Sequence, residues 1–434
     1  MAGESWQLRT LDGCAKFFSG GTPSKSRAEF WAGTIPWVSA KDLKVFRLHD
    51  AEDHVTAEAL DAGSRLAPAG SIFLLVRGMT LHNDVPICVA MRDMAFNQDI
   101  KALQPKQGVD GSFLTYWLLA HKPTLLSSVD SAGHGTGRLN TDTLKAMEVN
   151  LPPLAEQKTI AAVLGALDDK IELNRRMNAT LEAMARALFQ SWFVDFDPVR
   201  AKLDGRQPPN LDKAAAALFP ATFQESEVGH IPRGWTIKPV GEVVDCVGGG
   251  TPSTAEPKYW EGGTHHWTTP KDFSSLQAPV LLDTDRRLTD AGIAKISSGL
   301  LPAGTLLLSS RAPVGYLAIA AMPVAINQGF IALKCNERAS NFFMLNWCQT
   351  NMAEIESRAT GTTFAEISKQ NFRPIRVVLP PKELMAGFTA KVAPLYAQIT
   401  ANLHQSRTLA TLRDTLLPKL LSGEVRVESK EALG

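Results

Sequence analysis

GGTPSKSRAEFW, residues 20–31, returns later in the same chain as GGTPSTAEPKYW, residues 249–260. The glycines, hydroxyls and lysine of the first copy suggest a phosphate-binding loop, but the glycine that should precede Lys25 is a serine. In the second copy the Lys-Ser pair has become Thr254-Ala255, and a phosphate-binding loop could not lose its lysine. Both copies keep Gly-Gly-Thr-Pro-Ser and a distal tryptophan. This pattern predicts a shaped turn ahead of a packed aromatic anchor.

The repetition covers nearly the whole chain. The matching pairs are PWVSAKDL (36–43) with HWTTPKDF (266–273), PAGSIFLLVR (68–77) with PAGTLLLSSR (302–311), FNQDIKAL (96–103) with INQGFIAL (326–333), and LPP at 151–153 with LPP at 379–381. Two copies are too few for a solenoid, which needs at least three units. The pattern therefore predicts two similar domains that are presented to one partner.

Each copy begins with short β-like runs, such as Ile72–Val76 and Thr305–Leu308, among Gly/Pro turns and brief helical stretches. This mixture predicts the α+β class, with two similar α/β domains separated by two long helices. The predicted boundaries are a first domain at 1–150, a first long helix at 151–194, a connector at 195–226, a second domain at 227–380, a second long helix at 381–423 and a C-terminal tail at 424–434.

Each long helix carries a heptad pattern held for more than four repeats. The seam positions are Ile160, Leu164, Leu167, Ile171, Asn174, Asn178, Leu181, Ala185, Leu188 and Trp192, matched by Phe388, Val392, Leu395, Ile399, Asn402, Ser406, Leu409, Arg413, Leu416 and Leu420. Either helix could lie on its own domain, but equal length and register favour a mutual antiparallel coiled coil.

Asn174 and Asn402 hold equivalent places near the middle of the two seams. A buried polar residue at such a position fixes helix register at some cost in stability. About a pseudo-two-fold axis the two residues would face each other and form a self-complementary Asn–Asn contact. The alternative is that both lie near a partner surface or solvent.

Composition excludes several classes of protein. The chain of 434 residues has 45 Lys+Arg against 44 Asp+Glu, so charge alone does not indicate a nucleic-acid partner. Its five cysteines form no Cys-x-x-Cys pair, which favours reduced thiols in the cytoplasm. The N-terminus lacks signal-peptide features, and the apolar runs are far shorter than the ~20 residues that cross a bilayer. We expect a cytoplasmic protein without a membrane span.

The block LPPLAEQKTIAAVLGALDDKIELNRRMNATLEAMARALFQSWFVDFDPV at 151–199 is distinctive. Together with the two GGTPS…W openings, LFP…ESEVGHIPRGW at 218–235 and LLPKLLSGEV at 416–425, it resembles the specificity subunits of type I restriction-modification systems. In that family two target-recognition domains lie at the ends of an antiparallel helical pair, and each reads one half of a split DNA sequence.

The resemblance implies the partners as well. They are double-stranded DNA, two adenine-N6 methyltransferase (modification) subunits and, in a complex that also cleaves DNA, two translocating nuclease (restriction) subunits. S-adenosylmethionine would be bound by the methyltransferase, and ATP and Mg by the nuclease if it is present, so no cofactor is expected on this chain. A helix from about Leu154 to Trp192 would be roughly 58 Å long, more than one ~34–36 Å turn of duplex, and would act as a ruler between half-sites.

No catalytic or metal-binding residue is expected. The chain has no Asn/Asp-Pro-Pro-aromatic loop, since NLPPL at 150–154 has an inserted leucine and no aromatic, and it has no glycine-rich S-adenosylmethionine loop. Asp168-Asp169-Lys170 lies inside a heptad helix and is interpreted as a solvated charge cluster. His265 and His266 would point to opposite faces of a strand, with no further ligand at metal-site spacing.

Two domains that read different half-sites should share the residues that build the scaffold or hold phosphates, and should differ where base edges are contacted. The shared candidates are Thr22, Ser24, Lys41, Arg77 and Asn97-Gln98, matched by Thr251, Ser253, Lys271, Arg311 and Asn327-Gln328. For the Asn-Gln pairs a buried hydrogen-bonded turn is slightly favoured over a DNA contact.

The copies diverge most at 78–84 against 312–316 and at 133–138 against 360–364. From these loops the candidate base readers are His82, Asn83, Arg138, Tyr316 and Thr362.

Two other functions stay open at this point. One is an assembly scaffold whose domains bind only proteins, and salt-dependent binding to duplex DNA would distinguish it. The other is a recognition subunit that serves a methyltransferase without a nuclease partner, which the neighbouring genes would decide.

Overall fold

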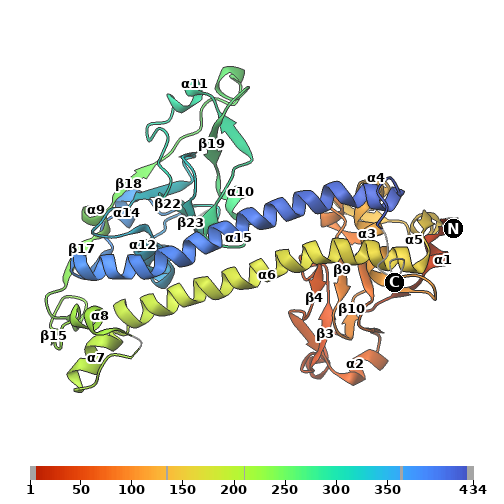
Figure 1. Cartoon of the computed structure of the whole chain (residues 1–434), viewed down its shortest axis with the longest axis horizontal. Helices are drawn as coiled ribbons and strands as arrows, with labels where there is room; N and C mark the ends of the chain where they lie inside the picture. Colours follow the sequence, from red (N-terminus) through yellow and green to blue (C-terminus); the bar gives the residue numbers. More distant parts are fainter. Residues whose placement is uncertain (1–5, 133–134, 210, 362–364, 428–434) are drawn as a thin grey trace. The chain divides into compact units, whose positions relative to one another are not determined.

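The computed structural model describes residues 6–132, 135–209, 211–361 and 365–427 (Figure 1). The chain divides into two compact units, residues 1–170 with 408–434 and residues 171–407. Each unit holds one copy of the repeat and a section of each long helix, α6 (Leu154–Phe193) and α15 (Lys382–Ser422). We describe the two units separately.

The first unit is built on a five-stranded sheet of order β2-β11-β7-β9-β4, with smaller sheets β5-β3-β10-β6, β12-β13-β8 and β1-β14. The strands are β1 (Gln7–Thr10), β2 (Ala15–Ser19), β3 (Ile35–Val38), β4 (Arg47–Leu48), β5 (Asp53–Val55), β6 (Leu66–Ala67), β7 (Ile72–Leu75), β8 (Arg77–Gly78), β9 (Ile87–Ala90), β10 (Met94–Phe96), β11 (Ile100–Pro105), β12 (Val129–Ala132), β13 (Thr136–Leu139) and β14 (Glu148–Leu151). The helices are α1 (Leu11–Cys14), α2 (Ala57–Asp61), α3 (Gly111–Ala120), α4 (Lys122–Ser127) and α5 (Thr141–Ala146), with 3-10 turns η1 (Ala28–Trp31) and η2 (Met79–His82).

The second unit repeats this topology in sheets β18-β25-β22-β23-β20, β21-β19-β24 and β17-β26, and adds the pair β15-β16. The strands are β15 (Phe223–Gln224), β16 (Ile231–Pro232), β17 (Thr236–Pro239), β18 (Asp245–Gly248), β19 (His265–Thr268), β20 (Val280–Leu281), β21 (Arg286–Leu288), β22 (Leu306–Ser310), β23 (Val314–Ala320), β24 (Val324–Ile326), β25 (Phe330–Lys334) and β26 (Arg376–Leu379). The helices are α7 (Asp197–Leu203), α8 (Lys213–Ala217), α9 (Val240–Val243), α10 (Pro270–Phe273), α11 (Asp290–Ile293), α12 (Asn341–Thr350), α13 (Met352–Ser357) and α14 (Lys369–Phe372), with the 3-10 turn η4 (Pro257–Tyr259).

Equivalent strands pair in the same sense in both units. β4 runs parallel to β9 as β20 does to β23, and β3 runs parallel to β10 as β19 does to β24. The predicted internal duplication and α+β class are therefore confirmed.

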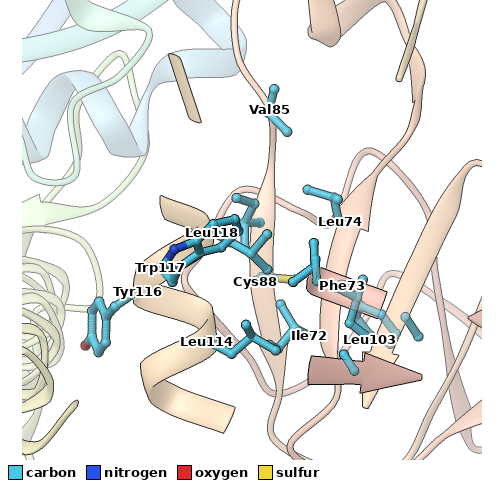
Figure 2. Packing of buried hydrophobic residues seen from close by; sticks show 14 of the residues in the cluster. Ile72, Phe73, Leu74, Val85, Cys88, Leu103, Leu114, Tyr116, Trp117 and Leu118 are labelled. Carbon is cyan, nitrogen blue, oxygen red and sulfur yellow. The ribbon is translucent and has the colours of Figure 1, made fainter. Parts of the chain in front are cut away.

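The core of the first unit lies between its main sheet and α3 (Figure 2). Strand β7 reads Ile-Phe-Leu-Leu, and every one of these side chains is buried, which indicates a strand covered on both faces. Leu114, Trp117 and Leu118 of α3 point toward the sheet, whereas Tyr116 points away from it (Figure 2). The Tyr116 side chain is therefore directed toward the long helices, where its hydroxyl contacts Asp168 of α6.

The Gly-Gly pair that opens each copy allows a close backbone approach. A Cβ on Gly20 would lie 2.1 Å from the Phe96 carbonyl oxygen, and one on Gly249 would lie 1.9 Å from that of Ile326. The next glycine, Gly21 or Gly250, donates its N–H to the same oxygen at 2.9 Å. Only glycine fits at the first position, because any side chain would collide with backbone.

The distal tryptophan of each copy is indeed an aromatic anchor. The rings of Trp31 and Trp37 meet edge to face at 5.0 Å, and those of Trp260 and Trp267 do so at 5.1 Å. Trp31 also donates its indole N–H to the Ser24 carbonyl at 3.2 Å. This geometry confirms the predicted turn ahead of a packed aromatic.

Within each unit, α6 and α15 pack antiparallel. In the second unit Asn178 meets Asn402, while Phe189, farther along α6, meets Phe388, which lies earlier on α15. In the first unit Asp168 of α6 meets Arg413 of α15. Of the predicted seam, Leu167 and Ile171 are only half-buried, and Asp168 is buried beside them.

Among the residues that the structure describes, no helix has the length and apolar character that would let it cross a membrane.

Candidate functional site

A buried polar layer joins the two long helices in the second unit. The Asn174 amide nitrogen donates to the Asn402 carbonyl oxygen at 3.3 Å and to Ser406 Oγ at 3.2 Å. The Asn402 amide nitrogen donates instead to Asn178 Oδ1 at 2.8 Å. The expected self-complementary pair of Asn174 and Asn402 side chains is therefore wrong.

The reason is the register of the two helices. Ser406 is the repeat equivalent of Asn178, so the local pseudo-two-fold relates the Asn174–Ser406 contact to the Asn402–Asn178 contact. The axis passes between successive seam positions and not through one. Equivalent residues are consequently staggered along the helices by four residues, about one helical turn or ~6 Å, so their side-chain amides do not pair directly.

A second buried polar cluster joins α3 to both long helices in the first unit. The Tyr116 hydroxyl donates to Asp168 Oδ2 at 2.6 Å, and Arg413 Nη1 donates to Asp168 Oδ1 at 2.6 Å. Asp168 is only 7% exposed, so its interpretation as part of a solvated charge cluster is wrong. Its exposed neighbour Asp169 pairs with Arg47.

The pKa values within this cluster are consistent with an ion pair. Burial raises the pKa of Tyr116, and the hydrogen bond to Asp168 raises it further, so the phenol keeps its proton. Burial alone would lower the pKa of Arg413, but the hydrogen bonds and negative charges of Asp168 and Asp414 together outweigh this effect and the pKa is raised. The Asp168 carboxylate therefore accepts hydrogen bonds from a neutral phenol and a charged guanidinium.

The second unit attaches its small sheet to α15 through Asp283. This carboxylate accepts from Arg407 at 2.5 Å and from Arg287 at 3.0 Å. Burial raises its pKa, but these hydrogen bonds and one from the Thr284 N–H outweigh that effect and lower the pKa to about 2. Asp283 is consequently ionised throughout the physiological range.

In the first unit the structure brings together the described residues of both divergent loops. Strand β13 pairs with β8 so that Arg138 lies directly opposite Arg77. His82, at the end of η2, donates its Nε2 proton to the Gly135 carbonyl oxygen at 2.8 Å, and Asn83 is exposed next to it. The predicted readers of 78–84 and 133–138 therefore share one surface.

The two arginines form an unusual cross-strand pair. Arg77 and Arg138 are both exposed, and among the residues at 6–132, 135–209, 211–361 and 365–427 neither forms an ion pair, although Asp130 of β12 is the cross-strand neighbour of Arg138 on its other side. Like charges directly opposite each other on neighbouring strands are destabilising. The pair therefore forms a surface that an anion or a hydrogen-bond acceptor would stabilise.

In the second unit four predicted residues line one hollow of about 440 Å³, namely Lys271, Arg311, Tyr316 and Asn327. Tyr316 is positioned by its backbone N–H, which donates to Ser309 Oγ at 2.8 Å. Arg311 forms a β-bridge with Glu366, and its Nη1 lies 3.5 Å from Glu366 Oε2. Thr362 lies outside the described residues.

The threonine of each GGTPS segment is bound to the Asn-Gln turn. Thr22 Oγ1 donates to Gln98 Oε1 and Thr251 Oγ1 donates to Gln328 Oε1, both at 2.6 Å. All four of these side chains are exposed. Because each glutamine oxygen accepts this bond, its amide nitrogen can donate to a ligand.

The asparagines next to these glutamines are held in turns. Asn97 Oδ1 accepts from the Asp99 N–H at 3.0 Å, and Asn327 Oδ1 accepts from the Gly329 N–H at 2.9 Å. This matches the hydrogen-bonded-turn alternative. Ser24 and Ser253 are exposed, and Ser24 shares a hydrogen bond with Ser26 at 2.8 Å.

The shared lysines differ in their surroundings. Lys41 Nζ lies 2.9 Å from Asp53 and 3.0 Å from Glu52, and the hydrogen bond to Asp53 is the main reason its pKa is raised. Lys271 is 85% exposed and lies 3.7 Å from Asp285. Lys271 can therefore reach a ligand without breaking a close ion pair, whereas Lys41 cannot.

No group of three or more His, Cys, Asp or Glu side chains that could hold a metal occurs in the described part of the chain. His265 bonds to Asp290 at 2.7 Å and His266 to Thr284 at 3.2 Å, so the two adjacent rings have different partners.

Sequence reasoning missed three features, namely the Tyr116–Asp168–Arg413 cluster, the pairing of Arg311 with Glu366, and a groove present in both units. The signal for the first was a charged residue, Arg413, at a seam position of the second long helix, with Asp168 next to the seam residue Leu167 on the first. The second carried no signal, because the loops around Arg138 and Glu366 differ in length.

An equivalent groove lies beside the long helices in each unit. In the first, a hollow of about 790 Å³ is lined by Ala120, the last residue of α3, and by Asp414 of α15. In the second, a hollow of about 750 Å³ is lined by Thr350, the last residue of α12, and by Arg186 of α6. Both grooves therefore occupy the same place in the repeat.

Comparisons with known proteins agree on one family. A family model described as the type I restriction modification DNA specificity domain matches residues 3–183 and 232–384. The type I restriction enzyme MjaIX specificity subunit of Methanocaldococcus jannaschii is 26% identical, over 98% of this chain and 94% of that protein. The HindI specificity subunit of Haemophilus influenzae is 28% identical, over 66% of this chain and 71% of that protein.

Among solved structures, the crystal structure of the S subunit of a type I restriction-modification system from M. genitalium resembles this fold. It covers 96% of both chains with a TM-score of 0.53 at 16% sequence identity.

Proposed function

Because this chain belongs to the type I restriction modification DNA specificity family, we propose that each of its units reads one half of a bipartite, asymmetric target in double-stranded DNA. The chain is a sequence-specificity subunit, so its role is recognition and not catalysis, and it carries no cofactor of its own. One observation supports the proposal that each unit reads its own half-site. In each unit a residue that differs between the copies lies beside the arginine that both share, Arg138 beside Arg77 and Tyr316 in the hollow with Arg311. A protein-only scaffold is not favoured.

The proposed DNA contacts fall into two classes. Residues shared by the copies hold phosphates or fix the register on the duplex, while residues that differ contact base edges. The shared set is Thr22, Ser24, Lys41 and Arg77 with Thr251, Ser253, Lys271 and Arg311. The differing set is His82, Asn83 and Arg138 with Tyr316 and Thr362. Because Lys41 is paired with Glu52 and Asp53, we propose that it supports the fold of the DNA-binding surface and does not contact a phosphate directly.

We propose that the helical pair sets the number of unread bases between the half-sites. Asn174 and Asn402 would fix its register, because each is buried and hydrogen-bonded to the opposite helix. A slip along the seam would leave these amides without partners at a cost of about 1–3 kcal/mol each.

We further propose that the two equivalent grooves each receive one methyltransferase subunit. A partner that binds one groove would find a hollow at the equivalent place in the other unit, which supports two copies per chain. Such a partner would bring S-adenosylmethionine, and a nuclease subunit, where one is present, would bring ATP and Mg.

Filling one groove tests this stoichiometry. Ala120→Trp and Thr350→Trp place a large ring at the matching helix ends, and the second of these grooves is also lined by the candidate base reader Tyr316. We expect native mass spectrometry to show one methyltransferase per chain for either single variant and none for the double variant. Two bound copies in the double variant would contradict the proposal. Lys213→Trp, at an exposed position of α8, is the control and should leave two copies bound.

Exchanging residues 1–150 for those of a relative tests independent reading. With the methyltransferase present in a host, we expect methylome sequencing to show one changed half-site and one unchanged half-site. Change in both halves would show that the two units do not read separately, and methylation without any bipartite motif would contradict the proposed function.

A further inference from the structure

The strongest unassigned feature is a reversal of charge at one position of the repeat. The Leu139 N–H donates to the Val76 carbonyl oxygen, and the Ile367 N–H donates to that of Ser310, both at 2.9 Å. Val76 and Ser310 each precede the shared arginine. The residues before Leu139 and Ile367 are therefore structurally equivalent, and they are Arg138 and Glu366.

Each of these two residues lies beside the arginine that both units share. Arg138 is the cross-strand partner of Arg77, and Glu366 is the bridge partner of Arg311. The backbone pairing at this position is thus shared by both units, whereas the side chain changes from a five-donor guanidinium to an acceptor-only carboxylate.

The two side chains suit different base edges. In the major groove guanine presents two acceptors, N7 and O6, which match an arginine, while cytosine presents the N4 amino donor, which matches a carboxylate. A carboxylate is repelled by phosphates, so an acid on a DNA-facing loop is compatible with binding only where it meets a donor. Glu366 is half-exposed and can turn toward such a donor.

The ion pair between Glu366 and Arg311 does not prevent Glu366 from contacting a base. The Glu366–Arg311 distance of 3.5 Å joins two side chains that are 46% and 36% exposed. Exposed pairs of this kind contribute about 0–1 kcal/mol, so a base contact can replace the pair at little cost.

We propose that this position determines specificity in both units, with Arg138 selecting guanine in one half-site and Glu366 selecting cytosine in the other. The inference rests on the proposed function and deepens it, because it names the base that each residue reads. Glu366 acts by direct contact and not merely by orienting Arg311.

The test is methylome sequencing of hosts that carry the full chain with its methyltransferase. Glu366→Gln should lower discrimination at one base pair of the second half-site by about 5- to 150-fold, since one good base contact is worth about 1–3 kcal/mol. Glu366→Arg should replace cytosine by guanine at that base pair. Arg138→Glu should make the reverse change in the first half-site only.

Controls separate reading from folding and from positioning. Glu354→Gln removes an equally exposed acid of the same unit, paired with Arg358, and should leave the motif unchanged. Thermal midpoints should stay near that of the natural chain, because exposed substitutions shift stability by about 0.5 kcal/mol or less.

Two results would overturn the inference. If the Glu366 variants weaken methylation equally at all sequences with no altered base preference, Glu366 only positions Arg311. If the motif changes at more than one base pair, the residue shapes the domain and does not read a base. Failure of the proposed function would look different, because the unaltered chain would then direct no bipartite methylation.

Discussion

Replacing Arg413 by alanine is expected to destabilise the first unit by about 3–5 kcal/mol, the cost of leaving a buried charge unpaired. Asp168 is 7% exposed and would retain only the Tyr116 hydroxyl as a partner. For a unit of this size the loss corresponds to a fall of roughly 10 °C in its thermal midpoint. Because the cluster joins α3 to both helices, specific DNA binding by this unit should fail at the same temperature.

The matched control is Arg175→Ala on the same helical pair. Arg175 pairs with Glu172 at 2.7 Å on an exposed helical surface, so its loss should cost at most about 1 kcal/mol. The double variant Asp168→Leu with Arg413→Leu should recover much of the lost stability, since apolar replacement of a buried pair is often neutral. Equal midpoints for Arg413→Ala and Arg175→Ala, measured by circular dichroism, would contradict a buried ionic role.

Lengthening both long helices together is expected to lengthen the unread spacer of the DNA target. Four residues inserted after Ala179 and four before Ala401 keep the Asn178–Asn402 contact on one side and the Phe189–Phe388 contact on the other, and they separate the exposed Asp283–Arg407 pair. Each insertion adds about 6 Å and rotates the remainder of its helix by roughly 40°. We expect a motif with unchanged half-site bases and a spacer longer by about two base pairs.

The single insertion after Ala179 is the informative comparison. It shifts Phe189 and Phe193 by about one helical turn along an unchanged α15, so both lose their packing against Phe388. We expect loss of methylation from this variant and recovery on adding the second insertion, measured by methylome sequencing. Methylation at the original spacing by the paired variant would mean that the helices do not set the distance.

Much of the architecture could be predicted because it is written in local patterns. The duplication shows as matching segments, and the long helices show as heptads, whose period follows from 3.6 residues per turn. The structural role of the GGTPS segment could be predicted by comparing the two copies, which both keep Gly-Gly-Thr-Pro-Ser and a distal tryptophan. The loss of lysine at Thr254 excluded a phosphate loop, and the structure supplied the physical reason for the glycines, the close approach of Gly20 and Gly249 to backbone.

The sequence predicted which loops form the candidate site, but it did not predict which of their residues meet. Divergence between copies indicated the segments at 78–84 and 133–138, and the structure brings them together through the pairing of Arg77 with Arg138. Divergence between the copies did not indicate Glu366. The equivalence of Glu366 and Arg138 depends on backbone hydrogen bonds between segments that are far apart in the chain.

The sequence by itself determined that this chain is a duplicated pair of α+β domains with long heptad helices, since periodicity and repetition are properties of neighbouring residues. Tertiary structure alone decided which polar groups meet. The sequence predicted that Asp168 is a surface charge, but in the structure it is hydrogen-bonded to Tyr116 and Arg413. Asn174 was expected to pair with the Asn402 side chain, but it donates to Ser406. Helical periodicity assigns a residue to a face, but burial and register depend on the surface opposite, which a single segment does not contain.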